Sequence, residues 1–139
     1  MEEDYGGPGL PLLVVDAANV VGSVPDGWWR DRRAAAERLR DALAAVAEHG
    51  LETSGPWHGG PLEVVLVVEG AARGVPGVPE VTVVEAPGSG DDRIVEVVGA
   101  ALTADPERAC LVVTADRGLR ARVTALGAEV TGPRAVRRA

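Results

Sequence analysis

Leu10-Pro11-Leu12-Leu13-Val14-Val15-Asp16 is the stretch that decides the fold, because it is a short apolar run that ends directly in an acidic residue. A continuous run of this length suits a strand buried on both faces, as in a parallel sheet. Similar apolar runs recur at 62–68, 81–85 and 109–114, and Val130 marks a short last strand. The sequence therefore predicts a central, mainly parallel sheet of four to five strands.

Helical patterns alternate with these runs. Apolar residues recur at helical spacing over 31–48, 91–103 and 117–126. Asp31 is a suitable N-cap for the first helix and Gly50 a suitable stop, while Ser89 or Asp91 suits the start of the second. Residues 17–30 are predicted to form a loop. The order β-α-β-β-α-β-α-β is typical of a Rossmann-like α/β fold with helices on both faces of the sheet.

The chain length of 139 residues predicts one domain. We expect residues 1–9 to form a flexible acidic tail and residues 10–133 to form the domain. Residues 134–139 carry Arg134, Arg137 and Arg138 and are expected to form a basic, solvated C-terminal tail.

Charge and composition narrow the possible functions. The net charge of −7 argues against a protein that coats nucleic acid non-specifically. All 14 basic residues are Arg, which indicates the coding bias of a GC-rich bacterial genome. Cys110, the lone cysteine, fits a core position in a protein of the reducing cytoplasm. The N-terminus lacks the pattern of a signal peptide, and no apolar run has the length of a membrane span.

Carboxylates follow several of the predicted strands. Asp16 follows the first strand, Glu69 the second and Asp116 the fourth, while Asp91 and Asp92 begin a helix. In an open parallel sheet the carboxyl ends of the strands share one edge with the N-termini of the helices. Clustered carboxylates repel one another unless a cation lies between them, and such oxygen ligands suit Mg²⁺ or Mn²⁺. Each acid taken singly is also an ordinary turn or cap residue.

Three segments resemble PIN-like ribonucleases of the NYN family, most closely the YacP-like branch. Val14-Val15-Asp16-Ala17-Ala18-Asn19-Val20 is similar to the family's first strand, which runs into Asp-x-x-Asn. Gly90-Asp91-Asp92-Arg93-Ile94 resembles its middle acidic segment, and Val112-Val113-Thr114-Ala115-Asp116-Arg117 resembles its third. The segments stand in the family's order, and the similarity spans about residues 10–133.

The resemblance implies a PIN/NYN fold and a divalent-metal-dependent endoribonuclease. Asp16, Asp91 and Asp116 would bind Mg²⁺ or Mn²⁺, and Asn19 would orient a water or a phosphate. Thr114 would support Asp116. Asp92 and Glu69 are further candidate ligands, because two acids stand in the middle segment and Glu69 stands where many relatives carry Asp.

RNA is the partner that the resemblance implies, and a protein partner or a homo-oligomer stays open. The alternative to a solvated C-terminal tail is that Arg134, Arg137 and Arg138 contact RNA. Trp28 and Trp29 are candidates to stack on unpaired bases, and Arg30 is a candidate to hold phosphate; the alternative is that one Trp covers the core. The competing function is a catalytically silent PIN-like module that binds RNA or protein. A receiver domain is disfavoured because the chain has no Lys, and a P-loop is disfavoured because 86–90 lacks the Lys and the spacing of that motif.

Overall fold

The computed structural model describes residues 9–25 and 27–137 and contains one sheet of five parallel strands. The strands are β1 (Leu12–Asp16), β2 (Glu63–Val68), β3 (Val81–Glu85), β4 (Cys110–Val113) and β5 (Glu129–Thr131). Their order across the sheet is β3-β2-β1-β4-β5. The chain builds outward from β1 on one side and then crosses to the other, so the topological switch point lies at β1 and β4. Ligands of open α/β sheets bind outside the strand ends at such a point.

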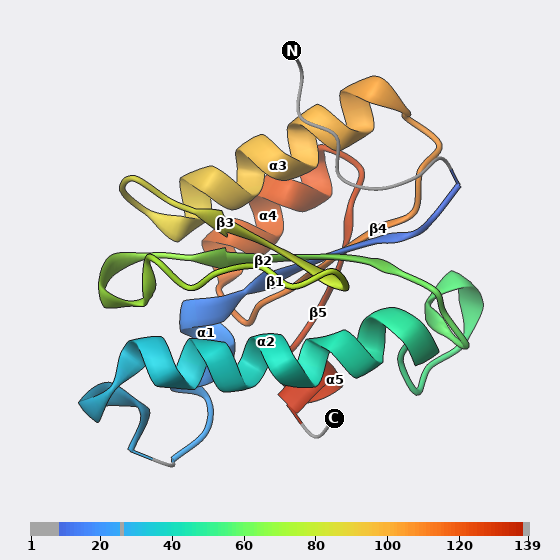
Figure 1. Cartoon of the computed structure of the whole chain (residues 1–139). Coiled ribbons are helices and arrows are strands. Elements are labelled where there is room, and N and C mark those ends of the chain that lie inside the picture. Colours follow the sequence, from blue (N-terminus) through green and yellow to red (C-terminus); the bar gives the residue numbers. More distant parts are fainter. Residues whose placement is uncertain (1–8, 26, 138–139) are drawn as a thin grey trace.

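Helices cover both faces of the sheet. On one face lie α1 (Ala17–Gly22), α2 (Arg32–His49) and α5 (Arg134–Arg137), and on the other lie α3 (Gly90–Ala104) and α4 (Arg117–Ala125) (Figure 1). Alternate strand residues serve the two layers: Leu13 and Val15 pack with α2, whereas Leu12 and Val14 pack with α3. The strands are buried on both sides, which explains why they are continuous apolar runs without polar alternation.

The predicted α/β fold is therefore confirmed, with helix boundaries close to those expected. Asp31 caps α2 by accepting a hydrogen bond from the Ala34 N–H at 3.0 Å, and Gly50 ends that helix. Ser89 caps α3 through the N–H of Asp91. Cys110 is 2 % exposed, as expected for a core residue.

Two segments differ from the sequence prediction. The predicted loop 17–30 contains α1 and the 3-10 turn η1 (Trp28–Arg30), because Asp16 caps a helix directly at the end of β1. The predicted C-terminal tail contains α5, because Val136 is fully buried among residues of the α2 layer. The expected N-terminal tail, residues 1–9, lies outside the described residues except for Gly9.

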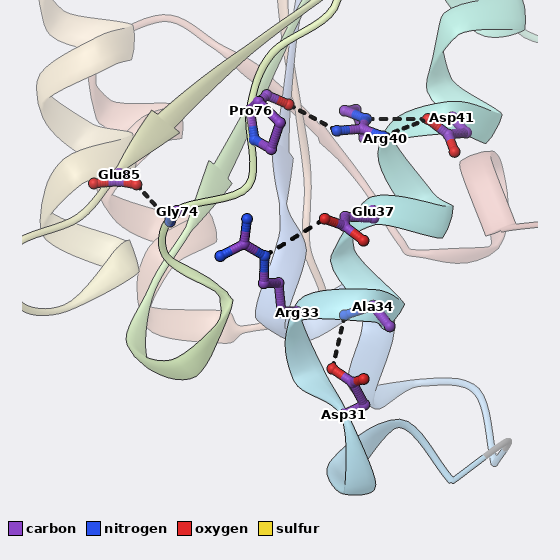
Figure 2. A network of polar contacts seen from close by, with 9 residues as sticks. All are labelled: Asp31, Arg33, Ala34, Glu37, Arg40, Asp41, Gly74, Pro76 and Glu85. Carbon is purple, nitrogen blue, oxygen red and sulfur yellow. Dashed lines mark hydrogen bonds and ion pairs between the residues drawn. The ribbon is translucent and has the colours of Figure 1, made fainter.

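Hydrogen bonds join the connection between β2 and β3 to helix α2 and to strand β3. Figure 2 shows Arg40 of α2 donating to the carbonyl oxygen of Pro76 at 2.9 Å, and the N–H of Gly74 donating to Glu85. The connection begins at Glu69 and the turn η3 (Gly70–Ala72), while η2 (Gly55–Trp57) lies in the preceding loop. These bonds hold the segment that follows Glu69 at the carboxyl end of β2.

Candidate active site

Asp16 lies at the centre of the carboxyl edge of the sheet and is 5 % exposed. The hydroxyl of Thr114 donates to its Oδ2 at 2.9 Å, and the backbone N–H of Asn19 donates to its Oδ1 at 3.4 Å. The pKa of Asp16 is raised to about 6, mainly by burial and also by the Asp91 and Glu69 carboxylates, against the lowering effect of the two hydrogen bonds. The charged form of Asp16 is thus held in a place that a nearby cation would stabilise.

Thr114 and Asn19 join β1 to β4. The hydroxyl of Thr114 is fully buried and accepts the N–H of Asp116 at 3.1 Å while donating to Asp16. Oδ1 of Asn19 accepts the N–H of Ala115 at 2.8 Å. The two strand ends are therefore cross-linked by two side chains, of which Thr114 also orients the carboxylate of Asp16.

Asp116 is exposed and caps α4, because its Oδ1 accepts the N–H of Leu119 at 2.9 Å. Arg120 of the same helix donates from Nε to the carbonyl oxygen of Thr114 at 2.8 Å. The cap engages Oδ1 of Asp116, and no described residue donates a hydrogen bond to Oδ2, so Asp116 can contribute one oxygen ligand.

Asp91 and Asp92 point to different surroundings although they are adjacent in the sequence. Burial raises the pKa of Asp91, and the carboxylates of Asp116 and Glu69 raise it further. Asp92 accepts a hydrogen bond from Arg122 of α4 at 3.0 Å, and its side chain is 67 % exposed. Asp91 therefore belongs with Asp16, Glu69 and Asp116 to one group of carboxylates, which we call the acidic edge. Asp92 instead forms an ion pair on the helix surface.

Glu69 is close to the other acids but is engaged by a helix. Its Oε1 accepts the N–H of Gly90 at 2.7 Å, at the first residue of α3. A Cβ on Gly90 would collide with that oxygen, so the glycine is what permits the close approach. Glu69 therefore neutralises the positive end of α3 and holds the turn that carries Asp91.

The carboxylates form an open set. Within residues 9–25 and 27–137, no three His, Cys, Asp or Glu side chains lie together as a preformed metal-binding group. Mg²⁺ is usually bound by one or two carboxylates and keeps several water ligands. The hard oxygen donors of Asp16, Asp91 and Asp116 fit such a hydrated cation and do not fit a site that encloses its metal with protein ligands.

The Trp pair lies in η1, downstream of α1. Trp29 is 56 % exposed, and Trp28 meets it edge to face with ring centroids 6.1 Å apart. The guanidinium of Arg30 lies 5.7 Å from the ring centroid of Trp29, and that of Arg32 lies 5.3 Å from that of Trp28. Trp28 is half-buried, and a third tryptophan, Trp57, is 4 % exposed in the core.

The sequence reasoning did not single out Arg120 or the position of Arg134. Arg120 contacts the site through the backbone of Thr114, a bond that no motif announces. Arg134 was assigned to a solvated tail, but it lies beside Asn19 and Ala115 at the rim of a hollow. The Gly132-Pro133 pair before it, which ends β5, is the signal that a turn follows there.

Comparison with known proteins identifies fold-level relatives. No family model matches the chain, and no curated protein matches it. A crystal structure of Rae1 (YacP) from Bacillus subtilis superposes with a TM-score of 0.67 at 19 % identity, covering 93 % of this chain and 72 % of that one. A mutant of the same protein gives a TM-score of 0.69 at 19 % identity, covering 93 % and 74 %. The chain therefore shares the fold of Rae1 (YacP), the branch that its sequence motifs resemble.

Proposed function

We propose that this protein is a divalent-metal-dependent endoribonuclease that hydrolyses RNA phosphodiester bonds at the edge formed by Asp16, Asp91 and Asp116. The single observation that carries the proposal is the hydrogen-bond network at the carboxyl edge of the sheet, in which the Thr114 hydroxyl links Asp16 to the N–H of Asp116 and Glu69 holds the first residue of α3, next to Asp91. The three NYN-like motifs deliver these acids, and the shared fold with Rae1 (YacP) supports the same reading.

Mg²⁺ or Mn²⁺ is the cofactor that this donor set suits. When bound, the cation supplies water activation and neutralises the charge that develops on the phosphodiester. Asp16 and Asp91 would hold it directly, and Asp116 would add an oxygen through the side of its carboxylate away from the α4 cap. Thr114 keeps Asp16 in place, and Asn19 presents its amide NH₂ group to a phosphate oxygen or a water.

RNA is the proposed substrate, and η1 supplies its contact with bases. The exposed ring of Trp29 offers a stacking surface for an unpaired base, and Arg30 is proposed to contact a phosphate.

Among the described residues, none of the helices combines the length and the hydropathy that a membrane span requires. We propose a cytoplasmic location, which accords with a lone, buried thiol.

The test is thermal unfolding in EDTA and in millimolar Mg²⁺ or Mn²⁺, followed by cleavage of a labelled single-stranded RNA. A cation that binds only the folded chain stabilises it by mass action, by about 2.7 kcal/mol at a hundred times Kd. We expect wild type to gain stability with metal and to cleave the RNA internally. Asp16→Asn should lose both effects, whereas the matched surface variant Asp41→Asn should keep both.

A silent binding module is the second candidate, and the open arrangement of the carboxylates favours it. On that reading RNA or protein binds without metal, and neither Mg²⁺ nor Mn²⁺ raises the unfolding temperature. Metal-dependent cleavage that is lost in Asp16→Asn excludes this alternative. Metal-independent RNA binding without cleavage establishes it.

A further inference from the structure

The hollow beside Asn19 adjoins the acidic edge but lies outside it. It has a volume of about 520 Å³ and is lined by residues that follow three different strands. Ala18 and Asn19 follow β1, Ala115 follows β4, and Gly132, Pro133 and Arg134 follow β5. Its size lies within the range of roughly 300–1,000 Å³ that is typical of ligand sites, and it lies at the topological switch point of the sheet.

Charge divides this edge of the molecule into two parts. The carboxylates of Asp16, Glu69, Asp91 and Asp116 are absent from the lining of the hollow, where Arg134 is the one charged side chain among the described residues. Arg134 is exposed, and no described carboxylate lies within ion-pair distance of it. Arg120 flanks the same place, since a Cβ on Gly132 would lie 3.7 Å from its Nη2. The hollow is thus a positive spot on a chain of net charge −7.

Asn19 connects the hollow to the acidic edge. Its Oδ1 must be the acceptor toward Ala115, because a backbone N–H can only donate. That bond orients its NH₂ group as the remaining donor, and no described residue accepts from it. A donor of this kind, an arginine and walls of small residues suit a phosphate with its sugar rather than a bulky apolar group.

We propose that this hollow is a nucleotide subsite, in which Arg134 holds an RNA phosphate next to the one that is cleaved. The inference rests on the proposed ribonuclease function and adds to it the path of the strand, from the acidic edge over Asn19 to α5. Burial of Val136 anchors α5 in the core, so Arg134 is held at the rim by the fold. Arg134 binds substrate, and the chemistry stays with the carboxylates.

The experiment measures binding of a fluorescent single-stranded oligoribonucleotide in Mg²⁺, on the Asp16→Asn background to prevent cleavage, over a range of salt concentrations. Arg134→Gln removes the charge, Arg134→Lys keeps it, and Arg38→Gln removes the same charge from an exposed α2 position that does not line the hollow. Steady-state cleavage is measured in parallel with an otherwise wild-type chain.

We expect Arg134→Gln to raise Kd about tenfold at low salt and to make the salt dependence shallower by about 0.7 in log–log slope, the value for one phosphate of a single strand. KM should rise while kcat changes little. Arg134→Lys should restore most of the slope, and Arg38→Gln should match the parent. An unchanged unfolding temperature of Arg134→Gln separates loss of binding from loss of α5.

Three results would overturn the subsite. If the wild type cleaves RNA and Arg134→Gln equals Arg38→Gln in Kd and slope, the hollow does not bind RNA and the ribonuclease proposal stands alone. If the chain neither binds nor cleaves RNA under any metal condition, the proposed function fails and the subsite fails with it. Equal losses in Arg134→Gln and Arg134→Lys would also contradict a role based on charge.

Discussion

The corner after β1 and the corner after β2 are built alike but use their carboxylates differently. Each follows a buried parallel strand at the same edge of the sheet. Asp16 accepts from the Thr114 hydroxyl and stays buried with a raised pKa, whereas Glu69 accepts from the first N–H of α3. Both acids accept a backbone N–H at the start of a helix, so burial is what distinguishes them. Asp16 is 5 % exposed and carries unfavourable charge that a cation can relieve, whereas Glu69 is only partly buried.

The largest expected difference between the corners is in catalysis. Asp16→Asn should lower the rate of metal-dependent RNA cleavage about a thousandfold, because a direct cation ligand contributes several kcal/mol to the transition state. Glu69→Gln should lower it by about tenfold or less, because it acts through the position of Asp91. Initial rates on a labelled RNA measure both. Equal losses would show that the two corners act alike.

The second difference is in the pH dependence of stability. The pKa of Asp16 rises from 3.8 to about 6 on folding, so between these values the folded chain keeps a proton that the unfolded chain releases. The proton on Asp16 therefore contributes about 3 kcal/mol to the free energy of unfolding below about pH 4. This contribution is lost as the pH rises to about 6.

Urea unfolding of wild type and Asp16→Asn in EDTA, at pH 4 and pH 7, isolates this contribution. Between pH 4 and pH 7, the free energy of unfolding of wild type should fall by about 3 kcal/mol relative to that of Asp16→Asn. A pH-independent difference for Asp16→Asn would contradict the raised pKa.

The third difference concerns the cap at the second corner. Gly90→Ala should displace Glu69 from the start of α3 and destabilise the fold by about 1–2 kcal/mol, since both a helix-end hydrogen bond and close packing are lost. Gly88→Ala is the matched control, because a Cβ there meets nothing within 4 Å. Chemical denaturation compares the two. Equal stability of the two variants would mean that the Glu69 cap contributes nothing.

The smallest expected effect separates the two adjacent acids of α3. Asp92→Asn breaks an exposed ion pair with Arg122, which typically contributes about 0.2–1 kcal/mol, and should change cleavage by less than about threefold. Asp91→Asn should behave like Asp16→Asn in cleavage and in stabilisation by metal. If Asp92→Asn is the more damaging variant, the assignment of Asp91 to the acidic edge is wrong.

The fold could be predicted from the sequence because each strand is a continuous apolar run and each long helix has a recognisable cap. It also placed Asp16, Asp91 and Asp116 at one edge, since strand ends in a parallel sheet share an edge. It favours Asp91 over Asp92 only by position in the motif, because the partner that draws Asp92 away is Arg122, which comes from another helix. It missed α5, because one buried valine among arginines has no periodicity to detect.

The bond between Asp16 and Thr114 has a consequence for how the protein is made. The two residues are separated by 98 positions, and Asn19 and Ala115 by 96. Contacts between such distant segments form late in folding, after the entropy of closing a long loop has been overcome. During synthesis on a ribosome, β1, β2 and β3 emerge well before β4. The group of carboxylates at the carboxyl edge is therefore incomplete in the nascent chain until β4 has emerged and paired with β1.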